Sequence, residues 1–141
     1  MLNEKPCGIE ALFVNSGVSS STPSGGFKKG DPVKLTDYKT GRECTANTDT
    51  VHGVLITDLA YPYTNKTLQV ATKGLVEVTA SGAVSIDAFV GLDSSDPRKY
   101  TALTLSASGT TYRQAFRAKS TASSDGDKFI IDLDDVQMVT V

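Results

Sequence analysis

The sequence predicts an all-β fold, and two observations support this prediction. Turn signals rich in Gly, Pro, Asp and Ser recur after Phe27, and short runs rich in Val, Ile, Thr and aromatic residues lie between them. No segment repeats apolar residues at i, i+3, i+4 and i+7 over three turns, so we expect little helix. Regularly spaced short strands are typical of a β-sandwich or a β-barrel. The length of 141 residues fits one compact domain.

The first 26 residues differ from the rest of the chain. Residues 15–26 form a Ser/Gly-rich run with too few apolar side chains to offset the entropy lost on ordering. We therefore predict a flexible N-terminal arm over residues 1–26 and a single β domain over residues 27–141. The arm carries an apolar patch made of Ile9, Leu12, Phe13 and Val14. Two interpretations of this patch stay open, since it could dock on a partner or cover the core of its own domain.

Strand signals follow one another along the predicted domain. Apolar and polar residues alternate with period two over residues 75–79, 112–119 and 128–134, as expected for strands buried on one face. In the second of these segments, Arg113, Arg117 and Lys119 should share the solvent face. Residues 51–57 and 88–92 are apolar on both faces, which indicates central strands or contact with a partner. The last run, residues 136–141, predicts a terminal strand.

Composition argues against several functions. The net charge of −2 gives no excess of Lys and Arg, so we expect no nucleic-acid partner. The sequence contains no run of about 18 apolar residues, so we expect no membrane span. The first residues lack the pattern of a secretion signal. Cys7 and Cys44 lie far apart, which predicts neither a zinc motif nor a disulfide framework. Free thiols fit synthesis in a reducing cytosol.

Catalytic motifs are scarce. His52 is the single histidine and lies in an apolar run, where a structural hydrogen bond is the favoured role. Aspartate pairs at Asp93/Asp96 and Asp125/Asp127 could bind Ca²⁺ or serve glycoside hydrolysis, but their Gly and Pro neighbours favour turns. No phosphate-binding glycine loop is present. We therefore expect no enzymatic activity, no cofactor and no metal site, and a small hydrolase using His52 or an Asp pair is the least supported reading.

Two tyrosines flank a proline at Tyr61-Pro62-Tyr63, where the sequence predicts a loop tip. Exposed tyrosines anchor protein interfaces, and they can also stack on sugars. Packing of the loop itself is an equally open role for Tyr61 and Tyr63.

Several motifs follow one another in a fixed order. They read G-D-x-V, G-V, V-x-x-x-G-x-x-E-V, V-G-x-D and D-G-D, and they lie within residues 30–35, 51–58, 68–78, 88–93 and 125–133. Their order and spacing resemble the capsid decoration, or cement, proteins of tailed bacteriophages. The long arm, residues 97–111 and residues 136–141 depart from the simplest members of that family.

The resemblance implies a small β-barrel or β-tulip-like domain of short antiparallel strands. Such a protein would be made in the bacterial host cytoplasm and would sit in the virion, on the outer surface of the phage head. It would form a homotrimer, bind the major capsid protein, stabilise the capsid lattice and lack catalytic residues. The alternative is a virion-surface module that binds a glycan or a receptor through Tyr61 and Tyr63. The candidate capsid- or subunit-binding residues are Ile9, Leu12, Phe13, Val14, Tyr61 and Tyr63.

Overall fold

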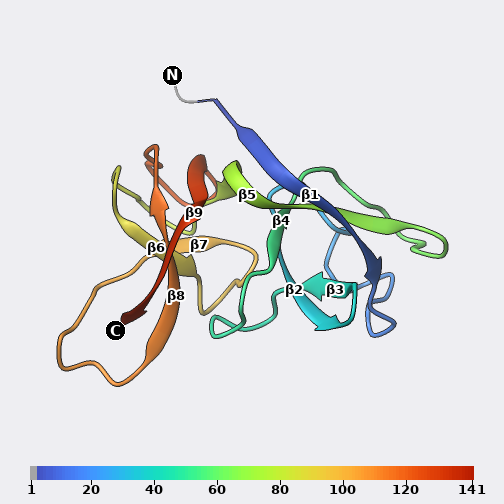
Figure 1. Cartoon of the computed structure of the whole chain (residues 1–141), viewed down its shortest axis with the longest axis horizontal. Coiled ribbons are helices and arrows are strands. Elements are labelled where there is room, and N and C mark those ends of the chain that lie inside the picture. Colours follow the sequence, from blue (N-terminus) through green and yellow to red (C-terminus); the bar gives the residue numbers. More distant parts are fainter. Residues whose placement is uncertain (1–2) are drawn as a thin grey trace.

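The computed structural model describes residues 3–141, and this part of the chain contains nine strands and no helix (Figure 1). The all-β prediction is therefore confirmed. Within the same residues no helix is long and apolar enough to cross a membrane. The strands are β1 (Lys5–Val14), β2 (Pro32–Asp37), β3 (Thr40–Glu43), β4 (Gly53–Leu55), β5 (Thr67–Thr79), β6 (Phe89–Leu92), β7 (Tyr100–Ala102), β8 (Tyr112–Ala118) and β9 (Lys128–Thr140).

All nine strands belong to one sheet, in the order β1-β3-β2-β4-β5-β9-β8-β6-β7, with a further pairing between β1 and β5. The strands β1, β3, β2, β4 and β5 therefore form a partial ring. The sheet is mixed because β1 pairs with β3 in parallel, whereas the other pairs are antiparallel. In Figure 1 the strands β1–β4 lie on one side of the molecule and β6–β9 on the other.

The expectation of short strands alone was wrong for β5 and β9, which contain 13 residues each. The strand β5 pairs with β1, β4 and β9, and β9 pairs with β5 and β8. Residues 67–75 of β5 pair with β1, and residues 75–79 pair with β9. Gly74 lies at this change of partner with φ +84°, and a Cβ atom there would collide with the carbonyl oxygen of Lys5. Glycine is the residue that tolerates both conditions.

The buried side chains form two clusters. The larger cluster lies among β4–β9, the loops between them and the segment before β4, and it contains Val76, Val78, Phe129, Ile131 and Leu133, as the period-two pattern predicted. The smaller cluster belongs to the ring and consists of Leu12, Phe27, Val33, Leu55, Leu68 and Val70.

The solvent face predicted for β8 is wrong at Arg113. This side chain is buried, and its Nη2 donates a hydrogen bond to the carbonyl oxygen of Leu92 at 2.6 Å. The pairing of β8 with β9 shifts register between Phe116 and Arg117. Arg117 is only partly buried and its guanidinium lies over the Phe89 ring, so the two arginines have different surroundings.

The predicted flexible arm is a strand over most of its apolar part. β1 pairs with β5 from Lys5 opposite Leu75 to Phe13 opposite Thr67. Leu12 is fully buried in the ring cluster, and this burial offsets the entropy of ordering the segment. The following Ser/Gly-rich run is also held, because Arg98 donates hydrogen bonds to the carbonyl oxygens of Ser24 and Gly26. Residues 1 and 2 of the predicted arm lie outside the described residues.

Candidate binding surface

The structure gathers four of the six predicted binding residues at one end of the ring. Phe13 and Val14 end β1, and Tyr61 and Tyr63 lie in the loop between β4 and β5. Two adjoining hollows of about 260 and 460 Å³ connect them, and both are lined by Val14, Tyr63 and Thr64. Tyr61 lines the first hollow and Phe13 the second. We call Phe13, Val14, Tyr61 and Tyr63 the aromatic surface.

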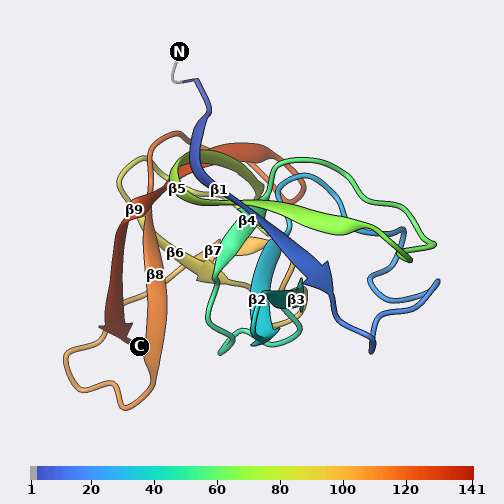
Figure 2. The same ribbon diagram turned by 45° about the vertical axis from the view of Figure 1, so that its right-hand side comes forward.

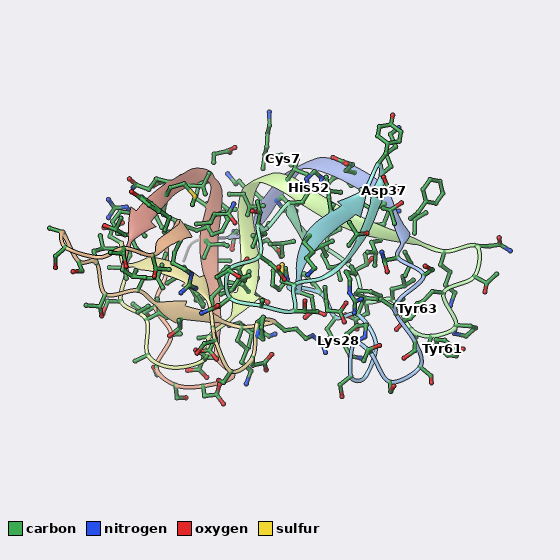
Figure 3. The ribbon with its side chains drawn as sticks, turned by 90° about the horizontal axis from the view of Figure 1, so that it is seen from below. Cys7, Lys28, Asp37, His52, Tyr61 and Tyr63 are labelled. Atoms are coloured by element: carbon green, nitrogen blue, oxygen red, sulfur yellow. The ribbon has the colours of Figure 1, made fainter. Side chains whose placement is uncertain are left out.

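Edge-to-face ring contacts hold the two tyrosines in place. The Tyr63 ring lies 5.2 Å from the buried Phe27 ring and 5.4 Å from the Tyr61 ring, measured between centroids. Tyr63 therefore joins the core to Tyr61, which is 56% exposed. Figure 3 shows the two tyrosines side by side. Burial raises the pKa of the Tyr63 hydroxyl, which has no hydrogen-bond partner among the described residues. These ring contacts therefore fix the positions of Tyr61 and Tyr63.

The residues of β1 divide according to the strand alternation. Phe13 is 61% exposed and Ile9 is 50% exposed, whereas Leu12 is fully buried. Alternate residues of a strand point to opposite faces, so Phe13 and Ile9 share the outer face and Leu12 faces the core. Leu12 therefore covers its own domain, and Val14 is half-buried against the same cluster. Ile9 lies about 13 Å along the strand from Phe13 and lines neither hollow.

Sequence reasoning missed two exposed apolar residues beside this surface. Leu35 is exposed on β2, and Tyr38 is exposed in the turn between β2 and β3. The β2–β3 hairpin adjoins Phe13, whose N–H donates a hydrogen bond to the carbonyl oxygen of Lys39 at 2.7 Å. The turn signal Asp37-Tyr38-Lys39-Thr40-Gly41, which places an aromatic residue at a tip, could have identified Tyr38.

His52 lies apart from the aromatic surface (Figure 3). Its Nε2 is 3.2 Å from Oε1 of Glu10, so the side chain links the segment before β4 to β1. This is the structural hydrogen bond that the sequence favoured. Both cysteines are free thiols, Cys7 is exposed and Cys44 is buried, and burial raises the pKa of the Cys44 thiol to about 12.

The aspartate pairs have turn geometry. Asp93 accepts hydrogen bonds from the backbone N–H groups of Ser95 and Asp96 at 3.1 and 3.0 Å. Asp127 accepts two from Ser123 and Ser124, both at 3.0 Å. Across residues 3–141 no group of three or more His, Cys, Asp or Glu side chains is placed to hold a metal ion.

The hydrogen bonds to Asp93 predict that the stability of the fold changes with pH in the acid range. The hydrogen bond from the Ser95 hydroxyl, with the two backbone donors, holds the Asp93 pKa below its usual value of 3.8. A lowered folded pKa means that ionised Asp93 stabilises the fold above that usual value, and that this contribution is lost as the pH falls through the folded pKa. Asp93→Asn should therefore lower the free energy of unfolding by about 1 kcal/mol at pH 7. The stability of this variant should also fall less than that of wild type as the pH is lowered.

Urea unfolding between pH 7 and pH 2 measures this effect. Asp87→Asn is the matched control, because the Asp87 carboxylate accepts no hydrogen bond from the other described residues. An Asp93→Asn variant whose stability follows wild type in parallel down to pH 2 would contradict the assignment.

The comparisons with known proteins assign no family. No protein-family model matches the chain, and no curated protein matches it either.

Proposed function

We propose that the protein is a capsid decoration protein of a tailed bacteriophage, which binds the outside of the phage head and stabilises the lattice of the major capsid protein. The observation that carries the proposal is the aromatic surface. It presents exposed rings on a rigid framework, as the anchor residues of protein interfaces do. Phe13 and Tyr61 come from segments distant in sequence, so the fold brings them together.

The motifs behind the resemblance support the proposal through their places in the fold. Residues 30–35 enter β2, residues 51–58 contain β4 and residues 68–78 lie in β5. Residues 88–93 contain β6, and residues 125–133 lead into β9. The motifs thus fall on successive parts of one sheet. The β-barrel or β-tulip-like architecture belongs to the same proposal, and the pairing of β1 with β5 that joins the ends of the ring favours it.

The proposed mechanism is stabilisation of the lattice by binding, with no chemical reaction. A protein that binds only the assembled lattice stabilises that lattice by the free energy of binding. Burial of a Phe or Tyr side chain contributes about 1.5–3 kcal/mol, and a homotrimer multiplies this contribution through effective concentration. The proposed partners are the major capsid protein and further copies of this chain. No enzyme activity, cofactor, nucleic acid or membrane takes part.

Co-sedimentation with heads of the encoding phage, before and after shell expansion, tests the proposal. We expect saturable binding to expanded heads, with a copy number that is a multiple of three. Phe13→Ser and Tyr61→Ser should each weaken binding at least about tenfold, because each removes an exposed anchor.

Ile86→Ser is the matched control. Ile86 is 59% exposed, close to the exposure of Phe13, but it lies between β5 and β6, away from the aromatic surface. This variant should bind heads like wild type. Absence of wild-type binding to either form of the head would refute the proposed function.

A glycan- or receptor-binding module on the virion surface is the second candidate. The observation in its favour is the exposed Tyr61 ring beside the hydroxyls of Ser16 and Thr64 in the smaller hollow. Under this alternative, Tyr61→Ala would lose binding in a glycan array and keep its affinity for heads. Tyr61 serves this test better than Tyr63, since Tyr63 also packs on Phe27 and its loss would disturb the core.

A further inference from the structure

A hollow of about 220 Å³ lies where four segments of the chain meet. It is lined by residues from the segment before β2, the end of β5, the segment between β6 and β7, and the start of β9. In Figures 1 and 2 the end of β5 and the start of β9 lie side by side, where Thr79 pairs with Lys128. None of the lining residues belongs to the aromatic surface or lines its two hollows. We call it the basic hollow, after the five cationic side chains that line it: Lys28, Lys29, Arg98, Lys99 and Lys128.

Positive charge is concentrated in the basic hollow, although the chain as a whole carries a net charge of −2. Five of the eight lining residues are Lys or Arg, out of a total of 14 in the chain. Only two carboxylates, those of Asp31 and Asp96, line the same hollow. A cleft lined mainly by one sign of charge raises the local concentration of ions of the opposite sign. The basic hollow should therefore attract anions.

The buried Asp31 carboxylate does not repel an anion from the basic hollow, because Arg98 neutralises it. Its Oδ2 accepts hydrogen bonds from Nη2 and Nε of Arg98 at 2.7 and 3.1 Å. Nη1 and Nη2 of Arg98 also donate to the carbonyl oxygens of Ser24 and Gly26. The Arg98–Asp31 pair is therefore committed to the fold, and the lysines provide the positive charge for a ligand.

Two of these lysines have no carboxylate partner. Lys28 and Lys128 are exposed, and neither forms an ion pair with any other residue in the part of the chain that the structure describes. The Lys128 ammonium donates a hydrogen bond to the hydroxyl of Thr79, which holds it at the basic hollow. The charges of Lys28 and Lys128 are therefore not offset by the protein.

The ion pairs of Lys29 and Lys99 leave these two lysines able to contribute as well. Lys29 pairs with Glu4 at 2.8 Å and Lys99 pairs with Asp125 at 2.9 Å, and neither carboxylate lines the basic hollow. Lys99 also lies 3.9 Å from Asp96 and offsets its charge. Ion pairs near the surface contribute little to stability. Both ammonium groups can therefore turn towards a bound anion at small cost.

The lining also defines the chemistry of the ligand. It contains no aromatic or aliphatic hydrophobic residue, so it offers no surface for a nucleobase or a hydrocarbon chain. The backbone N–H groups of Lys28 and Lys29 already donate to Asp31 and Asp58, so lysine side chains rather than a backbone loop must hold the ligand. A lysine ammonium is a compact point charge that binds phosphate. We propose that the basic hollow binds a small multivalent oxyanion of the phosphate class, and this inference does not depend on the proposed function.

A nuclear magnetic resonance titration of the full chain tests this inference, with inorganic phosphate, pyrophosphate and acetate as probes at pH 7 and constant ionic strength. We expect saturable shifts of the backbone amide signals of Lys28, Thr79, Lys99 and Lys128. Pyrophosphate should bind more tightly than phosphate because it carries more charge, and acetate with its single charge should bind most weakly. Shifts that do not saturate, or that saturate only at other residues, overturn the inference. Acetate binding as tight as that of pyrophosphate also overturns it.

The double variant Lys28→Gln/Lys128→Gln separates binding in the basic hollow from an effect of overall charge. It removes the two ammonium groups that lack a carboxylate partner, so it should weaken pyrophosphate binding at least about tenfold. The matched control is Lys5→Gln/Lys73→Gln, which removes the same charge at exposed lysines that do not line the basic hollow. This control should bind pyrophosphate within about twofold of wild type, because salt screens distant charges. Circular dichroism verifies that both variants fold. An unchanged affinity of the first variant, or equal weakening in both, overturns the inference.

Discussion

Replacing Leu12 with alanine is expected to lower the free energy of unfolding by about 2–5 kcal/mol. Leu12 is fully buried in the ring cluster with Phe27 and Leu68, so the substitution removes apolar contacts and leaves a cavity. A domain of this size has a total stability of about 5–15 kcal/mol. The loss should therefore be obvious as a lower urea midpoint with an unchanged slope.

Phe13→Ala is the control on the same strand. Phe13 is mostly exposed, so this change should cost less than about 1 kcal/mol. A large loss of unfolding free energy for Leu12→Ala beside a small loss for Phe13→Ala would show that β1 packs on the domain. If Leu12→Ala were as mild as Phe13→Ala, β1 would not be part of the folded domain in solution.

Local patterns were sufficient where a strand has one buried face. The alternation around Val76 and Val78 predicted their burial, and the same pattern predicted Phe129, Ile131 and Leu133. These side chains alternate with polar neighbours, and a strand with one side in water requires that pattern. The turns at Asp93 and Asp127 were also predictable, because an aspartate binds its own backbone within a few residues.

The strand β1 could not be predicted in this way, because its stability comes from distant residues. Its own composition and the Ser/Gly-rich run after it indicate disorder. What orders it is pairing with β5 and burial of Leu12 against Leu68 and Phe27. The candidate site also depends on residues that are distant in the sequence. Phe13 and Tyr61 were each singled out from the sequence, but only the fold shows that they line neighbouring hollows.

Arg98→Met is expected to destabilise the protein by about 3 kcal/mol, near the lower end of the range for a broken buried ion pair. The Arg98 guanidinium donates to Oδ2 of Asp31 from Nη2 at 2.7 Å and from Nε at 3.1 Å. It also binds the carbonyl oxygens of Ser24 and Gly26. Its removal leaves the buried Asp31 carboxylate without its cation and releases the segment that connects β1 to β2. Urea unfolding at pH 7 measures this loss.

The pH dependence of this loss separates the ion pair from simple packing. Burial raises the Asp31 pKa above its usual value, and the Arg98 guanidinium opposes that rise. Without Arg98 the folded pKa should move higher still. A raised folded pKa means that stability falls as the pH rises through the window between the usual value and the folded one. The deficit of Arg98→Met should therefore be largest at pH 7 and should shrink as the pH approaches 4.

Two further variants complete the argument. Asp31→Asn combined with Arg98→Met removes the uncompensated charge, so the double variant should lose less than the sum of the single losses. Lys99 follows Arg98 in the chain and forms an exposed ion pair with Asp125. Lys99→Met breaks this pair and should lower the free energy of unfolding by about 1 kcal/mol or less. A deficit of Arg98→Met that is the same at pH 7 and pH 4, together with additive single losses, would show that Arg98 acts through packing alone. The other result would identify the Arg98–Asp31 pair as the link that holds residues 24–31 against the loop before β7, and thereby positions β1 and the aromatic surface at its end.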